Sequence, residues 1–238
     1  MHETVVIPMQ QQTLALNWHG LPHSFETFRI GQNTVACRML HQWLEQSGSC
    51  ASFYVWGARG CGKTHLLQAA CRHISERGGL SAYLPLADVL TLPVGVLEGL
   101  DNMDLVCLDD VQTIAGIDSW EHAIFNLYHV LNDNKIPLLL AADVSPHQLN
   151  TLADIISRFA QGTVYQLETL SETDQSELLQ NYAAELGLVL PDSIAHFFIK
   201  HHADLKTMIG WLEQLDGLAS GKKRRLTLPF VKDALNIA

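Results

Sequence analysis

The sequence predicts an α/β fold, in which a parallel five-stranded sheet with helices on both faces is followed by a small all-α domain. Short unbroken apolar runs, typical of parallel strands buried on both faces, alternate with helix-length amphipathic segments from Ala51 to about Gln166. A glycine-rich loop ending in Gly-Lys-Thr lies between the first run and the next helical segment. After Leu170 the strand-like runs stop.

The expected strands are short apolar runs rich in aromatic, β-branched and leucine side chains. The segments Lys63–Glu76 and Asp118–Leu131 carry apolar residues at i, i+3, i+4 and i+7, the spacing of one helix face. We therefore expect helices there, packed on the sheet. The five expected strands are Ser52–Trp56, Ser81–Leu84, Leu105–Leu108, Leu138–Ala142 and Thr163–Leu167.

The C-terminal part is predicted to be a helical lid packed on the α/β domain. Ser171 is followed by acids and is typical of a helix N-cap, and this helix is expected to end at Gly187. Pro191 opens a second helix, Asp204 a third and Leu228 a fourth. The predicted domains are a tail at residues 1–22, an α/β domain at residues 23–168 and a lid at residues 169–238.

The composition argues against several classes of protein. The 238 residues carry a net charge of −10, so the chain lacks the basic surface that general DNA binding requires. Five scattered cysteines without a C-x-x-C pair argue against a disulfide framework and for a reducing cytosol. No apolar run is long enough to span a membrane, and no signal peptide is evident. We expect a cytoplasmic protein with no membrane contact and no direct sequence-specific DNA binding.

The segment Gly57–Thr64 (GARGCGKT) fits the phosphate-loop pattern G-x-x-x-x-G-K-[ST] and lies between an expected strand and an expected helix. Glycines allow successive backbone N–H groups to turn toward one point, where the helix N-terminus adds its own unsatisfied N–H groups. Lys63 adds a full positive charge at the β- and γ-phosphates, and the Thr64 hydroxyl can ligate Mg²⁺. The sequence therefore predicts a nucleotide-phosphate site.

Two acids follow the buried run Leu105–Leu108, in the Walker B pattern. Asp109 is expected to hold Mg²⁺ through water. Asp110 is placed either to polarise an attacking water or to hold the hydrogen bonds of the site. Adjacent acids at a strand end can also cap the following turn, and this alternative stays open for both residues.

These motifs resemble the AAA+ core of the bacterial replication initiator DnaA. The resemblance rests on GCGKTHLL from Gly60 to Leu67 and on LDDVQ from Leu108 to Gln112. It continues with HSFETFRIGQN at residues 23–33, IISRF at 155–159 and LTLPFVKDAL at 226–235, and it covers the chain from about residue 24 onward. It implies an AAA+ domain with a helical lid, with ADP or ATP and Mg²⁺ as cofactors.

In this family the segment at residues 23–33 packs over the nucleotide base, so the resemblance implies that its apolar side chains lie near the base. It also implies phosphate contacts from the loop and from the start of the following helix. The implied cofactor-binding residues are Phe28, Ile30, Gly57, Gly60, Cys61, Gly62, Lys63, Thr64 and His65, and the implied metal-binding residues are Thr64 and Asp109.

The resemblance assigns three further roles. Arg158 is the candidate arginine finger, which completes the active site of a neighbouring molecule; the alternative is a surface ion pair with Asp154. Asp143 would be the sensor between the phosphate and the Walker B acids; the alternative is an N-cap before Pro146. Lys206 stands where the lid of this family usually has a nucleotide-sensing arginine, and it keeps the charge without the bidentate fork.

The departures from DnaA narrow the resemblance. The chain ends where DnaA continues into its duplex-reading domain, the connection from Pro85 to Asp104 is shorter than in DnaA, and about twenty residues precede the core. These features are similar to the Hda family of DnaA-related proteins, which inactivate DnaA after replication starts. The resemblance implies a negative regulator of replication initiation that, with nucleotide bound, stimulates hydrolysis of the ATP on DnaA.

Members of the Hda family are tethered to the DNA polymerase sliding clamp by a short N-terminal peptide. The tail of this chain contains QQTLAL, which fits the clamp-binding pattern Q-x-x-L-x-L. The alternative is a strand or staple whose leucines pack on the core. The implied clamp-binding residues are Gln11, Gln12, Leu14 and Leu16.

A second interpretation shares the same motifs. A self-sufficient AAA+ ATPase, such as a helicase loader that remodels replication proteins, would also need both Walker motifs and an arginine finger. Intrinsic ATP turnover separates the two, because a regulator of the Hda kind is expected to hydrolyse ATP weakly. Whether a homodimer hides Arg158 stays open.

Overall fold

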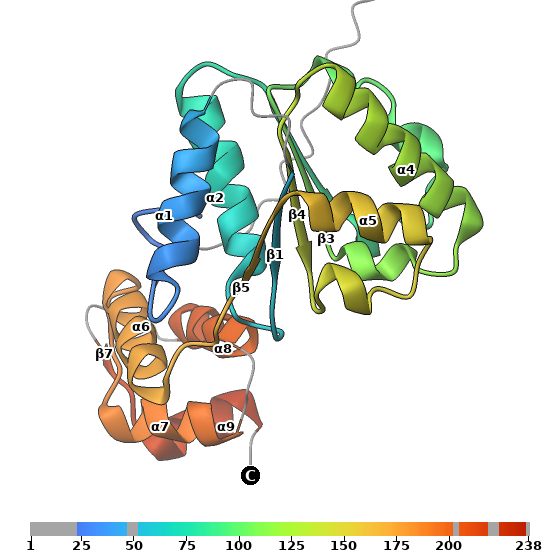
Figure 1. Cartoon of the computed structure of the whole chain (residues 1–238). Coiled ribbons are helices and arrows are strands. Elements are labelled where there is room, and N and C mark those ends of the chain that lie inside the picture. The colour runs from blue at the N-terminus through green and yellow to red at the C-terminus, as the bar shows by residue number, and fades with distance from the viewer. Residues whose placement is uncertain (1–22, 47–51, 202–204, 219–223, 237–238) are drawn as a thin grey trace, which may run out of the picture.

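The computed structural model describes residues 23–46, 52–201, 205–218 and 224–236. It has the expected architecture, a three-layer α/β core followed by a helical lid (Figure 1). In the described part of the chain, no helix combines the length and the apolarity needed to cross a membrane.

The core contains one parallel sheet of five strands in the order β2-β3-β4-β1-β5. β4 therefore lies between β1 and β3, and Leu139 of β4 is paired with Phe53 on one side and with Cys107 on the other. The predicted strands are confirmed to within a residue or two at their ends. Their bounds are β1 (Phe53–Trp56), β2 (Ser81–Pro85), β3 (Leu105–Asp109), β4 (Leu138–Ala142) and β5 (Thr163–Gln166).

One face of the sheet is covered by α1 (Thr34–Glu45) and α2 (Lys63–Glu76) (Figure 1). α2 has the predicted bounds, whereas α1 is not among the helices expected from the sequence. α1 nevertheless buries Ala36, Leu40 and Trp43, which lie on one helix face at i, i+4 and i+7. The apolar cluster on this side joins both helices to Phe53, Val55, Leu105, Cys107, Leu139 and Ala141 of the sheet.

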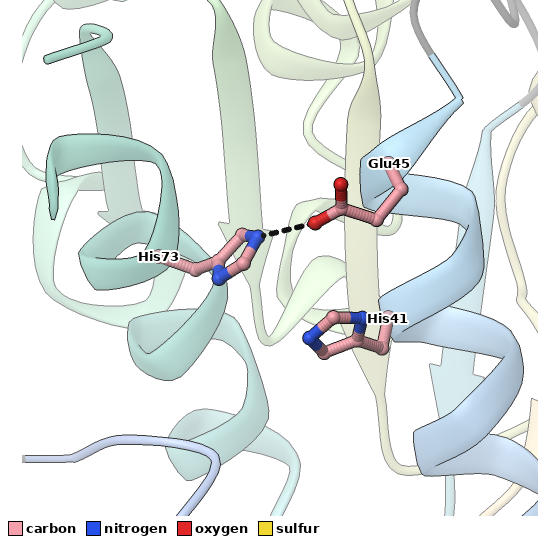
Figure 2. A group of neighbouring side chains, drawn as sticks. All are labelled: His41, Glu45 and His73. Carbon is pink, nitrogen blue, oxygen red and sulfur yellow. Dashed lines mark hydrogen bonds and ion pairs between the residues drawn. The ribbon is translucent and has the colours of Figure 1, made fainter. Parts of the chain in front are cut away.

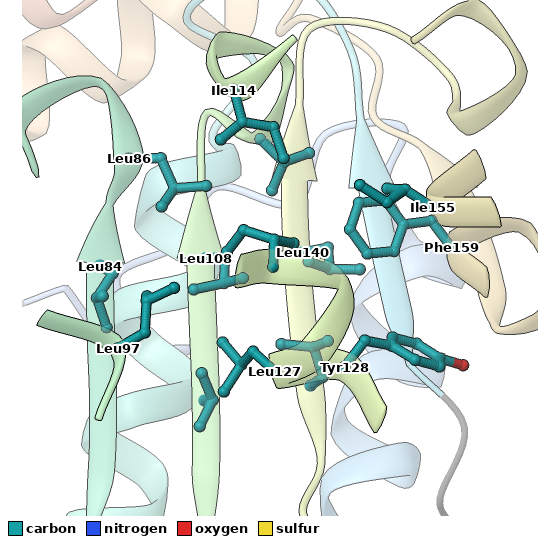
Figure 3. Packing of buried hydrophobic residues seen from close by; sticks show 14 of the residues in the cluster. Leu84, Leu86, Leu97, Leu108, Ile114, Leu127, Tyr128, Leu140, Ile155 and Phe159 are labelled. Atoms are coloured by element: carbon teal, nitrogen blue, oxygen red, sulfur yellow. The ribbon is translucent and has the colours of Figure 1, made fainter. Parts of the chain in front are cut away.

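The other face is covered by α4 (Asp118–Asp133) and α5 (Ala153–Gln161). Figure 3 shows part of the second apolar cluster, in which these helices pack on the sheet. The two clusters are separated by the sheet itself, because successive side chains of a strand point to opposite faces. Short elements connect the strands on this side: α3 (Leu86–Val89) and the 3-10 helices η1 (Val94–Leu97), η2 (Leu100–Asn102), η3 (Val111–Ile114) and η4 (Pro146–Gln148).

In its described residues, the lid contains four helices and its own apolar cluster. Ser171 caps the first of them as predicted, because its hydroxyl accepts a hydrogen bond from the Asp174 N–H. The lid also has a two-residue parallel ladder that the sequence did not suggest, formed by β6 (Leu188–Val189) and β7 (Arg224–Arg225). The helices are α6 (Glu172–Glu185), α7 (Asp192–His201), α8 (Leu205–Leu218) and α9 (Leu228–Leu235).

Candidate nucleotide site

The phosphate loop connects β1 to α2, and two of its glycines lie where no side chain fits. A Cβ on Gly57 would lie 2.4 Å from the Leu167 carbonyl oxygen. Gly62 precedes α2 with φ +100°, and a Cβ there would lie 2.6 Å from Cε2 of Phe28. Gly60 also has a positive φ, +82°. The loop therefore lies against Leu167, the residue after β5, on one side and against the Phe28 ring on the other.

Lys63, the first residue of α2, is 7% exposed and bonded on three sides. Its Nζ donates to the carbonyl oxygens of Gly57 at 2.7 Å and Ala58 at 3.1 Å, and it lies 2.8 Å from Oδ1 of Asp143. The Asp143 side chain is 48% exposed, so solvent screens this ion pair. These contacts hold the Lys63 ammonium at the loop and link it to Asp143, the residue after β4.

Asp109 ends β3 and is 2% exposed. Its Oδ2 accepts hydrogen bonds from the Thr64 hydroxyl at 2.6 Å and the Tyr83 hydroxyl at 2.9 Å, and its Oδ1 accepts one from the Asp110 N–H at 3.0 Å. Burial raises the pKa of the Asp109 carboxyl, and the hydrogen bond from Thr64 opposes this rise. A hydroxyl and a carboxylate in contact beside a phosphate loop are oxygen donors of the kind that Mg²⁺ prefers.

Asp110 and Asp143 are connected through a side chain that sequence reasoning missed. Gln112 Nε2 donates to Oδ1 of Asp110 at 3.1 Å, and Gln112 Oε1 accepts from the Asp143 N–H at 3.2 Å. Asp110 has φ +56° and precedes η3 without a capping hydrogen bond from its side chain. The cap of η4 is Ser145, which forms a capping box. Asp110 therefore occupies the N-cap position of η3 without a capping bond from its side chain, whereas the N-cap of η4 is Ser145 and not Asp143.

Residues 23–33, here called the lead-in segment, run along the start of α2. The His65 Nε2 lies 2.9 Å from the Ser24 carbonyl oxygen and 3.3 Å from the Thr27 hydroxyl. The rings of Phe28 and His65 contact each other edge to face, 5.3 Å apart. Burial lowers the pKa of His65 to about 4, so the imidazole is neutral at pH 7. The side chain of His65 thus holds the lead-in segment, and a contact of this residue with the nucleotide stays a prediction.

The lead-in segment also reaches the lid. The buried side chain of Asn33 makes a two-way pair with the backbone of Glu168, since its Nδ2 donates to the carbonyl oxygen at 2.9 Å and its Oδ1 accepts from the N–H at 2.8 Å. Glu168 lies between β5 and α6, so Asn33 fixes the start of α1 to the core–lid connection. Arg29 pairs with Glu177 of α6 at 3.4 Å across the surface. Asn33 is a second residue that sequence reasoning missed.

A groove of about 540 Å³ lies beside the lead-in segment and α1. Two residues expected near the base line it: Phe28, which is buried, and Ile30, which is 41% exposed. Phe28 therefore contacts both the groove and the phosphate loop. The remaining lining residues are Phe25, Thr34, Cys37, Arg38, His41 and Gln42.

Two family models match this chain. That of the Hda lid domain matches residues 172–235, and that of the bacterial DnaA ATPase domain matches residues 96–166. The chain belongs to the DnaA-related AAA+ proteins. Its lid is of the Hda kind, and its core has the DnaA ATPase fold.

Solved structures agree with this assignment of the DnaA-related chain. A DNA replication initiation factor is 25% identical with a TM-score of 0.71, over 84% of this chain and 66% of that protein. AMPPCP-bound DnaA of Aquifex aeolicus is 25% identical with a TM-score of 0.67, over 80% of this chain and 63% of that one. Domain III of Thermotoga maritima DnaA shares the fold at 22% identity and a TM-score of 0.73, over 90% and 95% of the two chains. The present chain thus spans just under two thirds of the first two relatives.

Two other residues predicted for this DnaA-related protein, Arg158 and Lys206, lie outside the phosphate loop. Arg158 lies on α5 and is half-buried, and its guanidinium donates to Oε1 of Gln161 at 3.4 Å, not to the alternative partner Asp154. Lys206 lies in the first turn of α8 with an exposed side chain. Cys61 is buried within the loop. The predicted clamp-binding residues, Gln11, Gln12, Leu14 and Leu16, lie outside the described residues.

Proposed function

We propose that this protein is a negative regulator of chromosomal replication initiation. With nucleotide bound and tethered to the sliding clamp, it stimulates hydrolysis of the ATP on DnaA through Arg158. The Hda-type lid on residues 172–235 carries this proposal, because it occurs on the same chain as a DnaA-type core with both Walker motifs. A role in replication initiation follows from the family. That the protein inhibits initiation, and that its partners are DnaA and the sliding clamp, is proposed.

The protein's own nucleotide is proposed to be ADP or ATP with Mg²⁺. Lys63 and the loop N–H groups would hold the phosphates, while Thr64 and Asp109 would hold the metal. Mg²⁺ would neutralise phosphate charge and fix the phosphates in place. ADP is proposed to bridge the core and the lid and to fix their relative position. This fits the position of the lead-in segment, which lies beside the loop and contacts α6 through Arg29 and Glu177.

The placement of Arg158 supports action on a neighbouring molecule. Its helix, α5, packs through Ile155 and Phe159 on the face of the sheet opposite to α2, so the arginine belongs to a different layer from the helix that starts at the phosphate loop. Its hydrogen bond to Gln161 is long and exposed, so its release costs little. An arginine finger supplied in trans is worth roughly 10³–10⁵ in the rate of phosphoryl transfer.

Hydrolysis of DnaA-bound ATP on clamp-loaded DNA, with this protein added, tests the proposal. Arg158→Ala should remove the stimulation while ADP binding by this protein is unchanged. Arg72→Ala is a matched control, because Arg72 is exposed on α2 and pairs with Glu76 of the same helix. If Arg158→Ala stimulates ATP hydrolysis as strongly as the parent protein does, Arg158 is not the arginine finger. Fast ATP turnover by the isolated chain would favour the helicase-loader interpretation.

The tether is tested separately. The double variant Gln12→Ala/Leu14→Ala should abolish capture by the immobilised sliding clamp and leave ADP binding intact, because these residues are the proposed anchors of an extended peptide. If the variant is still captured, the N-terminal tail is not the clamp-binding segment. The assignment of Arg158 as the arginine finger would not be affected.

A further inference from the structure

We propose that His41, Glu45 and His73 form a binding site for a divalent transition-metal ion of the Zn²⁺ type, which ties α1 to α2. Figure 2 shows the three side chains facing one another across the two helices. His41 and Glu45 are four residues apart on α1 and share a helix face. His73 faces them from the last turn of α2. Their ligand atoms all lie within 4.8 Å of one another.

Two imidazoles and one carboxylate are a donor set that zinc accepts, with a fourth position left for water. Zn–N and Zn–O bonds of about 2.0–2.2 Å in a tetrahedron place ligand atoms about 3.3 Å apart. The His73 Nε2 and Glu45 Oε1 are 3.0 Å apart, so this pair already has nearly the required spacing. The other separations, at most 4.8 Å, close by small rotations about side-chain bonds. Mg²⁺ prefers an all-oxygen shell, and this set does not suit it.

The surroundings restrict the two imidazoles. The Phe25 ring lies 5.6 Å from the His41 ring and 5.8 Å from the His73 ring, and the two imidazole rings are 5.1 Å apart. Contact with the same phenyl ring and with each other restricts the rotation of both imidazoles. The ligands are therefore partly preorganised, which lowers the entropic cost of binding.

Arg77 competes for the carboxylate. Its Nη1 lies 2.7 Å from Oε1 of Glu45, and its Nη2 donates to Oε2 at 2.8 Å. A metal ion on Oε1 would displace Nη1, whereas the bond to Oε2 can persist as a contact that orients the ligand. The Arg77 side chain is 53% exposed, so its guanidinium can move into solvent. Arg77 therefore lowers the affinity of the site without blocking it.

The site is distinct from the nucleotide site. His73 lies ten residues after Lys63, which is about 15 Å along α2. α1 follows Asn33, where the lead-in segment is fixed to the core–lid connection, and ends at Glu45. A metal ion at the far ends of both helices would hold α1, and with it the lead-in segment, against α2. This inference does not depend on the proposed function.

Titration of the full chain with Zn²⁺ alone, in buffer containing Mg²⁺, tests the site by calorimetry and thermal unfolding. One ion per chain should bind, and Tm should rise by roughly 5–10 °C at 100-fold excess over Kd. His41→Ala/His73→Ala should lose this event while retaining ADP binding as evidence of folding. The matched control His122→Ala/His196→Ala removes two exposed histidines whose Nδ1 atoms contact carbonyl oxygens of their own helices, and it should bind as the parent does.

Arg77→Gln adds a variant that should gain affinity. Removal of the competing cation should tighten Zn²⁺ binding several-fold at an unchanged stoichiometry of one ion per folded chain. The proposal is overturned if His41→Ala/His73→Ala keeps the one-ion event, or if Arg77→Gln binds Zn²⁺ no more tightly than the parent.

Discussion

The lead-in segment contacts its two neighbours very differently. On the α2 side, the Phe28 ring lies against Gly62, and the imidazole of His65 reaches the Ser24 carbonyl oxygen at 2.9 Å, with Phe28 and Ser24 buried. On the lid side, Gly31 lies close to the Leu170 side chain, and the polar contact with α6 is an ion pair at 3.4 Å between Arg29 and Glu177, whose side chains are 41% and 60% exposed.

This difference indicates which boundary can open. Buried packing and hydrogen bonds that exclude water resist local unfolding, whereas exposed ion pairs contribute little. The lead-in segment therefore behaves as part of the core, and the lid is the body that can change position against it. Asn33 lies where the two boundaries meet, because it bonds to Glu168 just before α6.

The largest predicted effect comes from Gly62→Ala. An alanine at φ +100° is strained, and its Cβ would overlap the Phe28 ring. We expect a loss of about 3 kcal/mol in the free energy of unfolding, measured by urea denaturation. Fluorescent ADP should also bind more than tenfold more weakly, because the loop N–H groups must move.

Gly78→Ala is the matched control for this variant. Gly78 has φ +79°, and a Cβ there would meet nothing within 4 Å. Only the backbone strain applies, so we expect a loss of about 1 kcal/mol and normal ADP binding. Equal losses in the two variants would mean that Phe28 does not press on the loop.

Asn33→Ala is predicted to cause the next largest loss in the free energy of unfolding. The substitution removes both hydrogen bonds to Glu168, at about 1 kcal/mol each, so the free energy of unfolding should fall by about 2 kcal/mol. Limited proteolysis should cut faster between core and lid. Asn126→Ala, on the exposed face of α4, should show neither effect. If proteolysis of Asn33→Ala is as slow as that of the parent, Asn33 does not stabilise the connection between core and lid.

Because the pKa of His65 is lowered, we expect the free energy of unfolding to depend on pH, with a change similar in size to that of Asn33→Ala. Its folded pKa of about 4 lies below the ordinary value of 6.5, so the stability it contributes is complete above pH 6.5 and is lost as pH falls toward 4. Between pH 7 and pH 5 this loss amounts to about 2 kcal/mol. Urea denaturation at the two pH values should show it in the parent and in His122→Gln, but not in His65→Gln. A loss that persists in His65→Gln would assign it to another group.

Arg29→Ala should have the smallest effect. Exposed ion pairs contribute about 0–1 kcal/mol, so we expect a loss below about 0.5 kcal/mol that disappears in high salt. Urea denaturation at low and high salt measures it. A loss as large as that of Asn33→Ala would show that the lid boundary is as firm as the core boundary, and the comparison would fail.

Local patterns in the sequence predicted most of the fold. The five strands are unbroken apolar runs, and the helix Lys63–Glu76 has a regular apolar face, so periodicity alone identified them. The phosphate loop was predictable for the same reason, since its glycines and Lys63 are contiguous. The β6–β7 ladder was not, because two residues on each strand give too little pattern.

The missed residues share a different property. Asn33 bonds to Glu168, 135 residues away, and Gln112 bonds to Asp143, 31 residues away. The pairing of His73 with Glu45 likewise joins two helices. Each is an ordinary polar residue in the sequence, and it acquires a role only when the fold supplies its partner. Such contacts are not predictable from spacing along the chain.

The position of β4 in the sheet has one further consequence. Asp143 directly follows this strand, and the same strand is aligned with β1, which leads to Lys63, and with β3, which ends at Asp109. The positions of Lys63, Asp109 and Asp143 relative to one another are thus set by the backbone pairing of β4 with its two neighbours. A slip of β4 by a single residue would turn its apolar side chains to the opposite layers and move Asp143 away from both neighbours together. Such a chain would keep every motif and still lack a working site.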